Sequence, residues 1–468
     1  MEKEYDIAVI GLGPAGMAVS IMGSEMGLDV LGIEKEALGG ECMNVGCIPS
    51  KSLLRMAAAR HSLEHASALG LSGGEKPFPE KPFQKIREYL SYIGERKTRS
   101  MFEKVDLKLG EGSASFQDRN TIKVGDSKYR AKRIFICTGT KPAVPLIPGM
   151  EDIDYLTNEN LFNLEEVPNS LVIIGGGAIG CEMAQAFSRL GCKTSVVHMD
   201  PYLLPHGDPD AGELLKNAFN EEGIQVYNGR KLEKAEMKDG MAVLHTDHGE
   251  TLTGEKLLVA AGRKHDFSFL NLEAAGVKYG PRGIRVSKHL KTSARNIYAC
   301  GDCNGYFLFS HAAMHQGMIA LINSMTPSPF KRDFRKYVVP WTVFTEPEIS
   351  HVGKTKRRLD AEGTDYEIIE EDYEDYGAAI AEGIAVGSVK AYASKSGKIY
   401  GVRIMGEGSG EMINEWGLAI QNGLRMHNIM FLQHSFPTMS FLSKRVSEGW
   451  MMNRMKSSFL KKLIRWWF

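Results

Sequence analysis

The stretch Gly11-Leu12-Gly13-Pro14-Ala15-Gly16 decides the fold of this 468-residue chain. An apolar segment at residues 5–10 precedes it and predicts a strand. A helical stretch follows to about Gly27, and a second apolar segment at residues 29–33 ends at Glu34. This order of strand, glycine-rich turn, helix, strand and acid is typical of a unit that binds a dinucleotide.

The glycines and the acid of this unit have separate physical roles. Gly11 permits the tight turn, Gly13 lets the backbone approach a pyrophosphate, and Gly16 lets helix and strand pack closely. The N–H groups at the start of the helix are donors for phosphate. Glu34 stands where a ribose-binding carboxylate belongs, so we expect this unit to bind the adenosine half of FAD.

The same pattern recurs later in the chain. Residues 171–174 predict a strand, residues 181–190 a helix and residues 194–197 the next strand, with Gly175-Gly176-Gly177-Ala178-Ile179-Gly180 as the turn. The expected phosphate-binding glycines are Gly175, Gly177 and Gly180. In each copy a further apolar strand runs into a glycine, Gly139 in the first and Gly262 in the second. Two copies with matching spacing predict two dinucleotides, FAD and a nicotinamide cofactor.

His198 occupies the position in the second copy that Glu34 occupies in the first. A carboxylate there would favour NAD, and an arginine just beyond it would favour NADP. His198-Met199-Asp200 offers neither, and His198 could contact a 2′-phosphate or could cap the strand. The choice between NADH and NADPH therefore stays open.

A cysteine pair, Cys42 and Cys47, lies between the two halves of the first unit. In a regular helix five residues rise about 7.5 Å, beyond the usual Cα separation in a disulfide. A bridge therefore requires a distorted turn, which Gly46 and Pro49 make possible. The neighbouring dinucleotide unit favours a redox disulfide over buried thiols or a metal site, for which a third and fourth ligand are missing nearby.

Composition excludes several classes of protein. Lys+Arg and Asp+Glu are both 57, so no net charge attracts nucleic acid. No apolar run reaches the roughly 18 residues of a membrane span, and the charged start is unlike a signal peptide. Seven cysteines are too few, and odd in number, for a secreted disulfide framework. These features predict a cytoplasmic protein.

Residues 39–51 resemble the redox-active motif of the flavoprotein pyridine nucleotide-disulfide oxidoreductases, a family that includes dihydrolipoamide dehydrogenase, glutathione reductase and mercuric reductase. Residues 292–302 are similar to the family's second FAD motif, residues 137–139 to its strand-end motif, and residues 340–349 to the start of its dimerisation domain. The resemblance assigns to FAD the residues Thr138, Gly139, Gly301 and Asp302, the last on the ribityl chain. It implies an α/β fold with two tandem Rossmann-like domains, for FAD and NAD(P), and a C-terminal α+β dimerisation domain. It also implies a homodimer with active sites shared between subunits.

The resemblance also implies the roles of the redox residues. Cys47 is expected to face the flavin, and Cys42 to be the interchange thiol that meets the substrate. Lys51 and Glu182 match an ion pair beside flavin N5. Glu41 replaces the usual threonine, and its carboxylate should disfavour a Cys42 thiolate unless it accepts a proton.

The sequence departs from the family near its C-terminus. Pro437 and Thr438 keep the register of the family's His-Pro-Thr motif, but Phe436 stands where the catalytic histidine belongs and Phe441 where its glutamate partner belongs. General acid–base catalysis contributes about 10²–10⁴-fold. We therefore expect a proton-poor pocket and slow turnover of ordinary disulfides, with an unusual disulfide or thioether as substrate.

Four alternatives remain. His434 or Glu41 could supply a substitute base in a dihydrolipoamide-dehydrogenase-like reductase. A carboxylating or C–S-cleaving enzyme is a second alternative, since 2-oxopropyl-coenzyme M oxidoreductase/carboxylase also has phenylalanine in place of this histidine. A metal reductase like mercuric reductase, which also lacks the histidine, ranks lower. The fourth alternative is a flavoprotein subunit of a larger redox complex.

The expected domains follow the order of the motifs. Residues 1–150 and 265–332 form the FAD domain, 151–264 the inserted NAD(P) domain and 333–449 the interface domain. Residues 450–468 form a separate basic amphipathic helix that ends in Trp466-Trp467-Phe468. Such a helix predicts contact with a membrane surface or an acidic partner, with packing on the dimer itself as the alternative.

Overall fold

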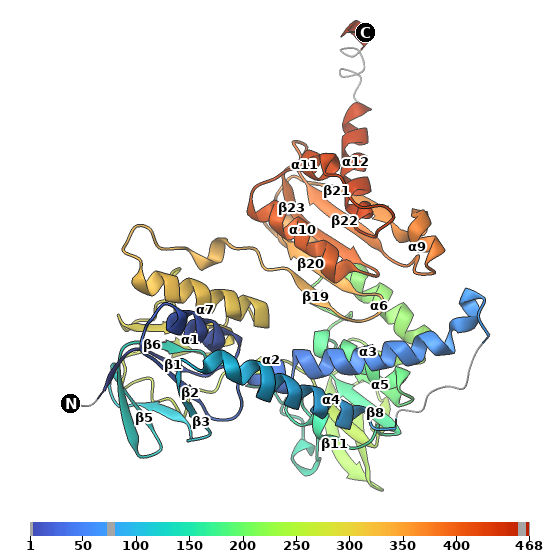
Figure 1. The fold of residues 1–468 in the computed structure, drawn as a ribbon. Coiled ribbons are helices and arrows are strands. Elements are labelled where there is room, and N and C mark those ends of the chain that lie inside the picture. The colour runs from blue at the N-terminus through green and yellow to red at the C-terminus, as the bar shows by residue number, and fades with distance from the viewer. Residues whose placement is uncertain (1–2, 73–79, 457–464, 468) are drawn as a thin grey trace.

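The computed structural model describes residues 3–72, 80–456 and 465–467, and the three largest of its six β-sheets organise this part of the chain (Figure 1). The first two sheets lie together in one half of the molecule, and the third forms the opposite half (Figure 1). No helix among the described residues is long and apolar enough to cross a membrane.

The first sheet has the strand order β3-β2-β1-β6-β5-β4, and β18 pairs in parallel with the C-terminal part of β6, beyond the part that pairs with β5. Its strands are β1 (Glu4–Ile10), β2 (Val30–Glu34), β3 (Asp106–Leu109), β4 (Ala114–Phe116), β5 (Thr121–Val124), β6 (Ser127–Ile136) and β18 (Ile297–Ala299). The central strands pair in parallel and are buried on both faces. Between β1 and α1, a Cβ on Gly16 would lie 1.9 Å from the Gly11 carbonyl oxygen, so only glycine fits this close packing of helix and strand.

The second nucleotide-binding pattern lies within the chain that separates β6 from β18. Its parallel sheet has the order β10-β9-β8-β14, and a three-stranded antiparallel sheet covers it. The strands are β8 (Ser170–Ile174), β9 (Lys193–Val197), β10 (Gln225–Tyr227), β14 (Lys256–Val259), β11 (Leu232–Lys238), β12 (Met241–Thr246) and β13 (Thr251–Gly254). Because β18 pairs with β6, the chain returns to the first sheet after this insertion.

The third sheet is antiparallel and has the order β19-β20-β23-β22-β21. Its strands are β19 (Trp341–Val343), β20 (Ile349–Gly353), β21 (Glu367–Asp372), β22 (Ser388–Ala393) and β23 (Ile399–Met405). Two-residue ribbons complete the strands: β7 (Lys141–Pro142) with β15 (Arg263–Lys264), and β16 (Tyr279–Gly280) with β17 (Gly283–Ile284).

The helices cover the sheets and bring the motifs together. They are α1 (Pro14–Glu25), α2 (Gly40–Asn44), α3 (Cys47–Glu64), α4 (Pro82–Ser91), α5 (Ala178–Arg189), α6 (Pro209–Glu221), α7 (Ser310–Met325), α8 (Lys356–Ala361), α9 (Gly377–Ala381), α10 (Ser409–Gln421), α11 (Met426–Phe431) and α12 (Phe441–Met455). The first helix, α1, packs beside α7, and α3 lies along α5 (Figure 1). The α1–α7 and α3–α5 contacts join distant parts of the chain at the redox motif.

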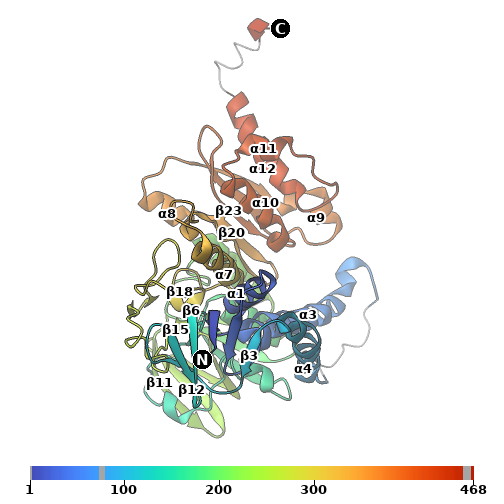
Figure 2. The same cartoon turned by 60° about the vertical axis from the view of Figure 1, so that its left-hand side comes forward.

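The C-terminal segment differs from the separate helix expected at residues 450–468. The helix α12 begins at Phe441, and its Trp450 is buried in the core of the third sheet. The boundary at 450 therefore falls inside a packed helix, because Trp450 belongs to the buried face of α12. The end of α12 projects from the third sheet (Figure 2), and the predicted helix over residues 457–464 and 468 lies outside the described residues.

Candidate functional site

The redox motif is divided between two helices. Cys42 lies on α2 and Cys47 is the first residue of α3, with Gly46 between them at φ −132° and ψ −111°. A Cβ on Gly46 would lie 2.8 Å from the Glu41 carbonyl oxygen, so a side chain cannot be placed there without a shift of the backbone. The break supplies the distorted turn that a bridge between Cys42 and Cys47 requires.

The two thiols are free, half-buried and hydrogen-bonded to each other. The hydrogen bond from Cys42, together with Ser310 and the Lys51 ammonium group, lowers the pKa of Cys47 to about 6 against the opposing effect of burial. Ser310 Oγ lies 3.3 Å from Cys47 Sγ. The same hydrogen bond and burial raise the pKa of Cys42. The proton of the pair therefore stays on Cys42, and Cys47 is the thiolate near neutral pH.

A cation lies beside this thiolate. Lys51 Nζ is 2.8 Å from Glu182 Oε2, so α3 and α5 are joined by an ion pair whose carboxylate is buried. The Phe344 N–H donates to Glu182 Oε1 at 3.1 Å, and the Phe344 ring lies 4.5 Å from Lys51 Nζ. The units built around all three main sheets thus contribute to one charged cluster. Lys51 lies on α3, which follows β2 of the first sheet, and Glu182 lies on α5, which follows β8 of the second. Phe344 follows β19 of the third sheet.

Glu41 is bound within its own chain. Arg263 Nη2 donates to Glu41 Oε2, and Asn158 Nδ2 lies 3.3 Å from the same oxygen. Arg263 also donates to the hydroxyl and the carbonyl oxygen of Thr140. The guanidinium neutralises the Glu41 carboxylate, so this geometry does not support Glu41 as a substitute base. The raised pKa of Cys42 has the Cys47 hydrogen bond and burial as its leading causes.

The residues expected to hold FAD line the carboxyl edge of the first sheet. Glu34 is buried, and its Oε2 accepts from the Leu12 N–H of the glycine turn at 2.8 Å. Thr138 Oγ1 is buried without a hydrogen-bond partner among the described residues. Burial raises the pKa of Asp302 to about 6, and Arg263 opposes the rise. An acid at the ribose end, a hydroxyl without a partner and a buried carboxyl fit a polar, extended dinucleotide.

Several of the glycines expected to bind the cofactors lie just after parallel strands of the first and second sheets. Positive φ angles occur at Gly11, Gly139, Gly175, Gly262 and Gly301. Gly13 and Gly177 precede α1 and α5 as their N-caps, and Gly180 lies in the first turn of α5. The backbone N–H groups of both helix starts therefore face the turns that would receive phosphate.

His198 directly follows β9, at the carboxyl end of the parallel strands of the second sheet. Its ring is buried against Gly176, and Nε2 lies 2.7 Å from Asn228 Oδ1. Burial lowers the pKa of His198, so the ring is neutral at pH 7. Asp200 Oδ2 lies 4.0 Å from Nδ1, which has no hydrogen-bond partner in the described part of the chain.

The aromatic pair that replaces the family's His-Glu dyad lies in and after the loop between α11 and α12. The Phe436 and Phe441 rings meet edge to face with centroids 5.4 Å apart, and Phe441 stacks on Tyr376 at 6.1 Å. Phe436 is 72% exposed, and Phe431 at the end of α11 is 75% exposed, so apolar rings on this side of the third sheet's unit face away from their own chain. Both views place α11 and α12 in the half of the molecule opposite the start of α3 (Figures 1 and 2). Within one chain the fold does not bring Phe436 to Cys42.

His434 is bound in the same loop region. Its Nε2 lies 3.0 Å from Glu415 Oε1 and its Nδ1 lies 3.3 Å from the Leu432 carbonyl oxygen. The His434 side chain is 4% exposed. Because both ring nitrogens have partners and the ring is covered, this arrangement does not support His434 as a substitute base. His434 and Glu415 instead hold the loop that presents Phe436.

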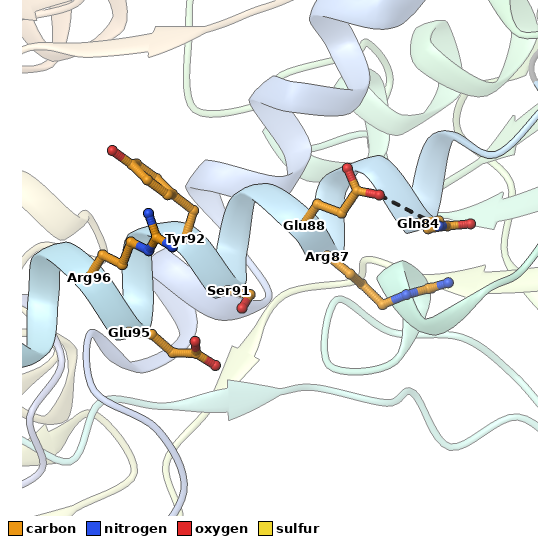
Figure 3. Close-up of a pocket in the computed structure, with 7 residues that line it drawn as sticks. All are labelled: Gln84, Arg87, Glu88, Ser91, Tyr92, Glu95 and Arg96. Carbon is orange, nitrogen blue, oxygen red and sulfur yellow. Dashed lines mark hydrogen bonds between the residues drawn. The ribbon is translucent and has the colours of Figure 1, made fainter.

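Other candidate features do not belong to the site. Cys137, Cys181, Cys192, Cys300 and Cys303 are buried, and burial raises the pKa of Cys192 to about 12. A surface hollow on α4 and the helical stretch after it is lined by polar side chains including Arg87, Glu88 and Tyr92 (Figure 3). These side chains point outward and pair with neighbours, as Arg87 does with Glu165. The hollow contains none of the redox residues.

Several residues that contact predicted site residues were not expected from the sequence, among them Ser310, Phe344, Arg263 and Asn228. Ser310 begins α7, and nothing in the local sequence indicates its contact with Cys47. Phe344 lies inside the stretch that resembles the dimerisation domain. Arg263 and Asn228 carried no local signal.

Comparison with known proteins gives consistent findings. The family description "Pyridine nucleotide-disulphide oxidoreductase" matches residues 5–317, and that family's dimerisation domain matches residues 339–445. Dihydrolipoyl dehydrogenase of Thermus scotoductus is 34% identical over 450 residues, which cover 94% of this chain and 95% of the relative. Mercuric reductase of Bacillus cereus is 31% identical over 443 residues, 93% of this chain and 70% of the relative. The HOCl-induced flavoprotein disulfide reductase RclA of Escherichia coli superimposes with a TM-score of 0.85 at 26% identity, covering 96% of this chain and all of that one.

Proposed function

Because the chain belongs to the pyridine nucleotide-disulphide oxidoreductase family, we propose that it passes electrons from NAD(P)H through the Cys42–Cys47 pair to an unusual sulfur substrate. The chain is an FAD- and NAD(P)H-dependent oxidoreductase that acts on a sulfur group. Its dimerisation domain indicates a homodimer. The observation that carries the proposal is the hydrogen-bonded thiol pair with the Lys51–Glu182 ion pair at its side.

Each residue of the cluster has a defined part in this proposal. Glu34, Thr138 and Asp302 would hold FAD, which would supply the transfer of two electrons from the nicotinamide to a Cys42–Cys47 disulfide. Cys47 holds the thiolate because Cys42, Ser310 and Lys51 stabilise its charge. Glu182 fixes the position of Lys51, and Cys42 keeps the proton until it meets the substrate.

The acceptor is a disulfide or thioether whose reaction needs no imidazole from the enzyme. Phe436 and Phe441 can exclude water from a sulfur pocket but can neither take nor give a proton. Loss of a general base removes about 10²–10⁴-fold of rate, which corresponds to about 3–5 kcal/mol of barrier. The exposure of Phe436 supports a role outside its own chain, over Cys42 of a second copy.

The proposal is tested by anaerobic addition of NAD(P)H to the purified holoenzyme. The flavin absorbance should fall, and a long-wavelength thiolate-to-flavin band should follow. Cys47→Ser should lack this band. The control variant Cys192→Ala, which removes a buried thiol just before β9, should keep it. An unchanged band in Cys47→Ser would exclude the redox pair.

NADH is the preferred donor in this proposal. The His198 ring is neutral at pH 7 and Asp200 lies beside it, so a 2′-phosphate would meet a carboxylate and no cation. Residues 198–208 contain no lysine or arginine, and Arg230 is bound to Glu250. A ribose 2′-hydroxyl, by contrast, could bond to the unpartnered Nδ1 of His198.

The donor preference is measured as the ratio of kcat/KM for NADH over NADPH. The wild type should favour NADH, and Asp200→Asn should lower the ratio by relieving repulsion of the phosphate. Glu233→Gln, which changes an exposed carboxylate on β11, should leave the ratio unchanged. A wild type that prefers NADPH contradicts the assignment.

The basic C-terminal segment is proposed to contact an anionic membrane surface. Trp466 and Trp467 are 78% and 79% exposed, and Met452 and Met455 are exposed at the end of α12. Aromatic and basic residues together favour the headgroup region of a bilayer. Co-sedimentation with anionic vesicles should require residues 457–468. Binding that survives their deletion, or no binding by the full chain, would exclude the proposal.

A further inference from the structure

The far end of the redox helix α3 carries three side chains that can bind a metal. His61 and Glu64 lie in its last turn, and His65 caps its C-terminus. One ligand atom from each residue lies within 4.8 Å of the others. Throughout residues 3–72, 80–456 and 465–467, this is the one group of three histidine, cysteine or acidic side chains with such spacing.

Their spacing along the helix explains the cluster. Residues three and four apart share one face of a helix, so His61 is a neighbour of both Glu64 and His65. The two imidazole rings lie with centroids 4.0 Å apart and planes inclined by 36°. Ligand atoms around one tetrahedral or octahedral ion at about 2.1 Å are roughly 3.0–3.5 Å apart. Small rotations of partly exposed side chains bring the three atoms to that separation.

The orientation of His65 suits a ligand. Its Nδ1 lies 2.8 Å from the His61 carbonyl oxygen. A carbonyl can only accept, so Nδ1 carries the proton and Nε2 has the free electron pair. Donation of the second ring nitrogen to a backbone carbonyl is the arrangement that fixes metal-binding histidines. The backbone of α3 therefore holds this imidazole in the tautomer that binds a metal through Nε2.

Charged groups of both signs surround this position: Arg189 opposes positive charge on His61, and Glu222 and Glu346 favour it. Arg60 Nη2 pairs with Glu64 Oε1 at 3.2 Å, so a metal would share this carboxylate with Arg60. Arg189 is paired with Glu222 and Glu346. The carbonyl groups at the C-terminus of α3 carry partial negative charge, which favours a cation there.

We propose that His61, Glu64 and His65 bind one divalent transition-metal ion of the zinc class, through two imidazole nitrogens and one carboxylate oxygen, with water completing the coordination. Two nitrogens and one oxygen select a borderline ion over Mg²⁺ or Ca²⁺, which prefer oxygen alone. The ion would fasten the last turn of the helix that begins with Cys47. The site is separate from the thiol pair and does not depend on the proposed redox function.

The test is calorimetric titration of Zn²⁺ into chelator-treated holoenzyme with the Cys42–Cys47 pair oxidised, so that these thiols do not compete. The wild type should bind one ion per chain. His61→Ala and His65→Ala each remove a ligand, so each should weaken binding by at least the roughly 10–100-fold that loss of a ligand's hydrogen-bond partner costs, and Glu64→Gln should weaken it less. His248→Ala, at an exposed histidine that also lies beside a carboxylate, should bind as the wild type does.

Two results would overturn the site. One is a wild type that binds no Zn²⁺, and the other is a His61→Ala/His65→Ala double variant with wild-type affinity. As a second readout, Cu²⁺ loaded at one equivalent should show two nitrogen ligands by electron paramagnetic resonance, and the double variant should not. Flavin reduction by NAD(P)H should be unchanged in these variants, which separates failure of the metal site from failure of the redox proposal.

Discussion

Cys47 differs from the other cysteines because three groups stabilise its anion. Cys42, Ser310 and Lys51 all lower its pKa. At Cys181 and Cys192 burial is the largest effect and raises the pKa, although a hydrogen bond with Thr194 opposes the rise at Cys192. The contrast separates a reactive thiol from packing thiols by environment alone.

The first prediction follows from the pKa of about 6 for Cys47. An acid whose pKa is lowered stays deprotonated down to that value, so the thiolate absorbance of the reduced enzyme should disappear only as pH falls through about 6. Ser310→Ala removes a hydrogen bond to the anion worth about 1.5–3 kcal/mol and should raise the midpoint by roughly one to two units. Ser324→Ala, at a buried serine of the same helix, should leave it unchanged. A midpoint near 9 in the wild type contradicts the assigned partners.

The second prediction concerns Phe436. Phe436→His introduces an ionisable ring where the family's acid–base stands, so turnover of small disulfides should rise at least tenfold, toward the 10²–10⁴-fold range of such catalysis. Phe436→Leu keeps the site apolar and should not raise turnover. Steady-state rates with NADH and a small disulfide decide the matter. Fast turnover by the wild type, or equal rates in the two variants, would show that Phe436 does not limit proton transfer.

At the scale of elements, the contact between α1 and α7 supports the cofactor cleft. α1 begins at the first glycine turn and α7 begins at Ser310, so their packing sets the distance between phosphate turn and thiols. Gly317 makes this contact possible, because a Cβ there would lie 2.4 Å from the Ala15 carbonyl oxygen.

The third prediction is that Gly317→Ala separates the two helices. Overpacking of this kind costs about 1–3 kcal/mol, so the melting temperature should fall and FAD should be released more readily. Gly94→Ala is the matched control, since nothing lies within 4 Å of a Cβ at that helical position. Thermal denaturation and flavin fluorescence provide the two measurements. Equal melting temperatures in the two variants would contradict the close packing.

At the scale of the whole molecule, the thiols and the Phe436 loop belong to opposite halves of one chain (Figure 1). A second copy is therefore needed to complete the proposed active site, in agreement with the match to a dimerisation domain. Sedimentation should give twice the 51.8 kDa of one chain.

The fourth prediction distinguishes an active site shared between chains from one within a chain. A chain with both Cys42→Ser and Phe436→His is paired with a wild-type chain in a purified mixed dimer. If the loop acts across the dimer, the new histidine faces the intact Cys42 of the wild-type chain and disulfide turnover rises above that of the wild-type homodimer. If the loop acts within its own chain, the histidine faces a hydroxyl in place of the interchange thiol and no gain occurs.

The sequence by itself determined the parts that local pattern encodes. The predicted α/β fold is confirmed, because strand, glycine turn and helix are properties of contiguous residues. The predicted strand at residues 5–10 corresponds to β1 (Glu4–Ile10), and that at 171–174 to β8 (Ser170–Ile174). The predicted start of the last helix at residue 450 was wrong, because α12 begins at Phe441. Trp450 packs on the third sheet, and the sequence alone does not distinguish a buried tryptophan from one on the exposed face of an amphipathic helix.

Only the tertiary structure decided the partners that tune the site. Ser310 lies 263 residues from Cys47, and Arg263 lies 222 residues from Glu41. From the sequence, both Glu41 and His434 were candidates for a substitute base. In the structure, Arg263 neutralises the Glu41 carboxylate and Glu415 binds the His434 ring. Electrostatic interactions and hydrogen bonds depend on distance in space. The chemistry of each group therefore depends on residues that are far away in the sequence and that only the folded chain brings into contact.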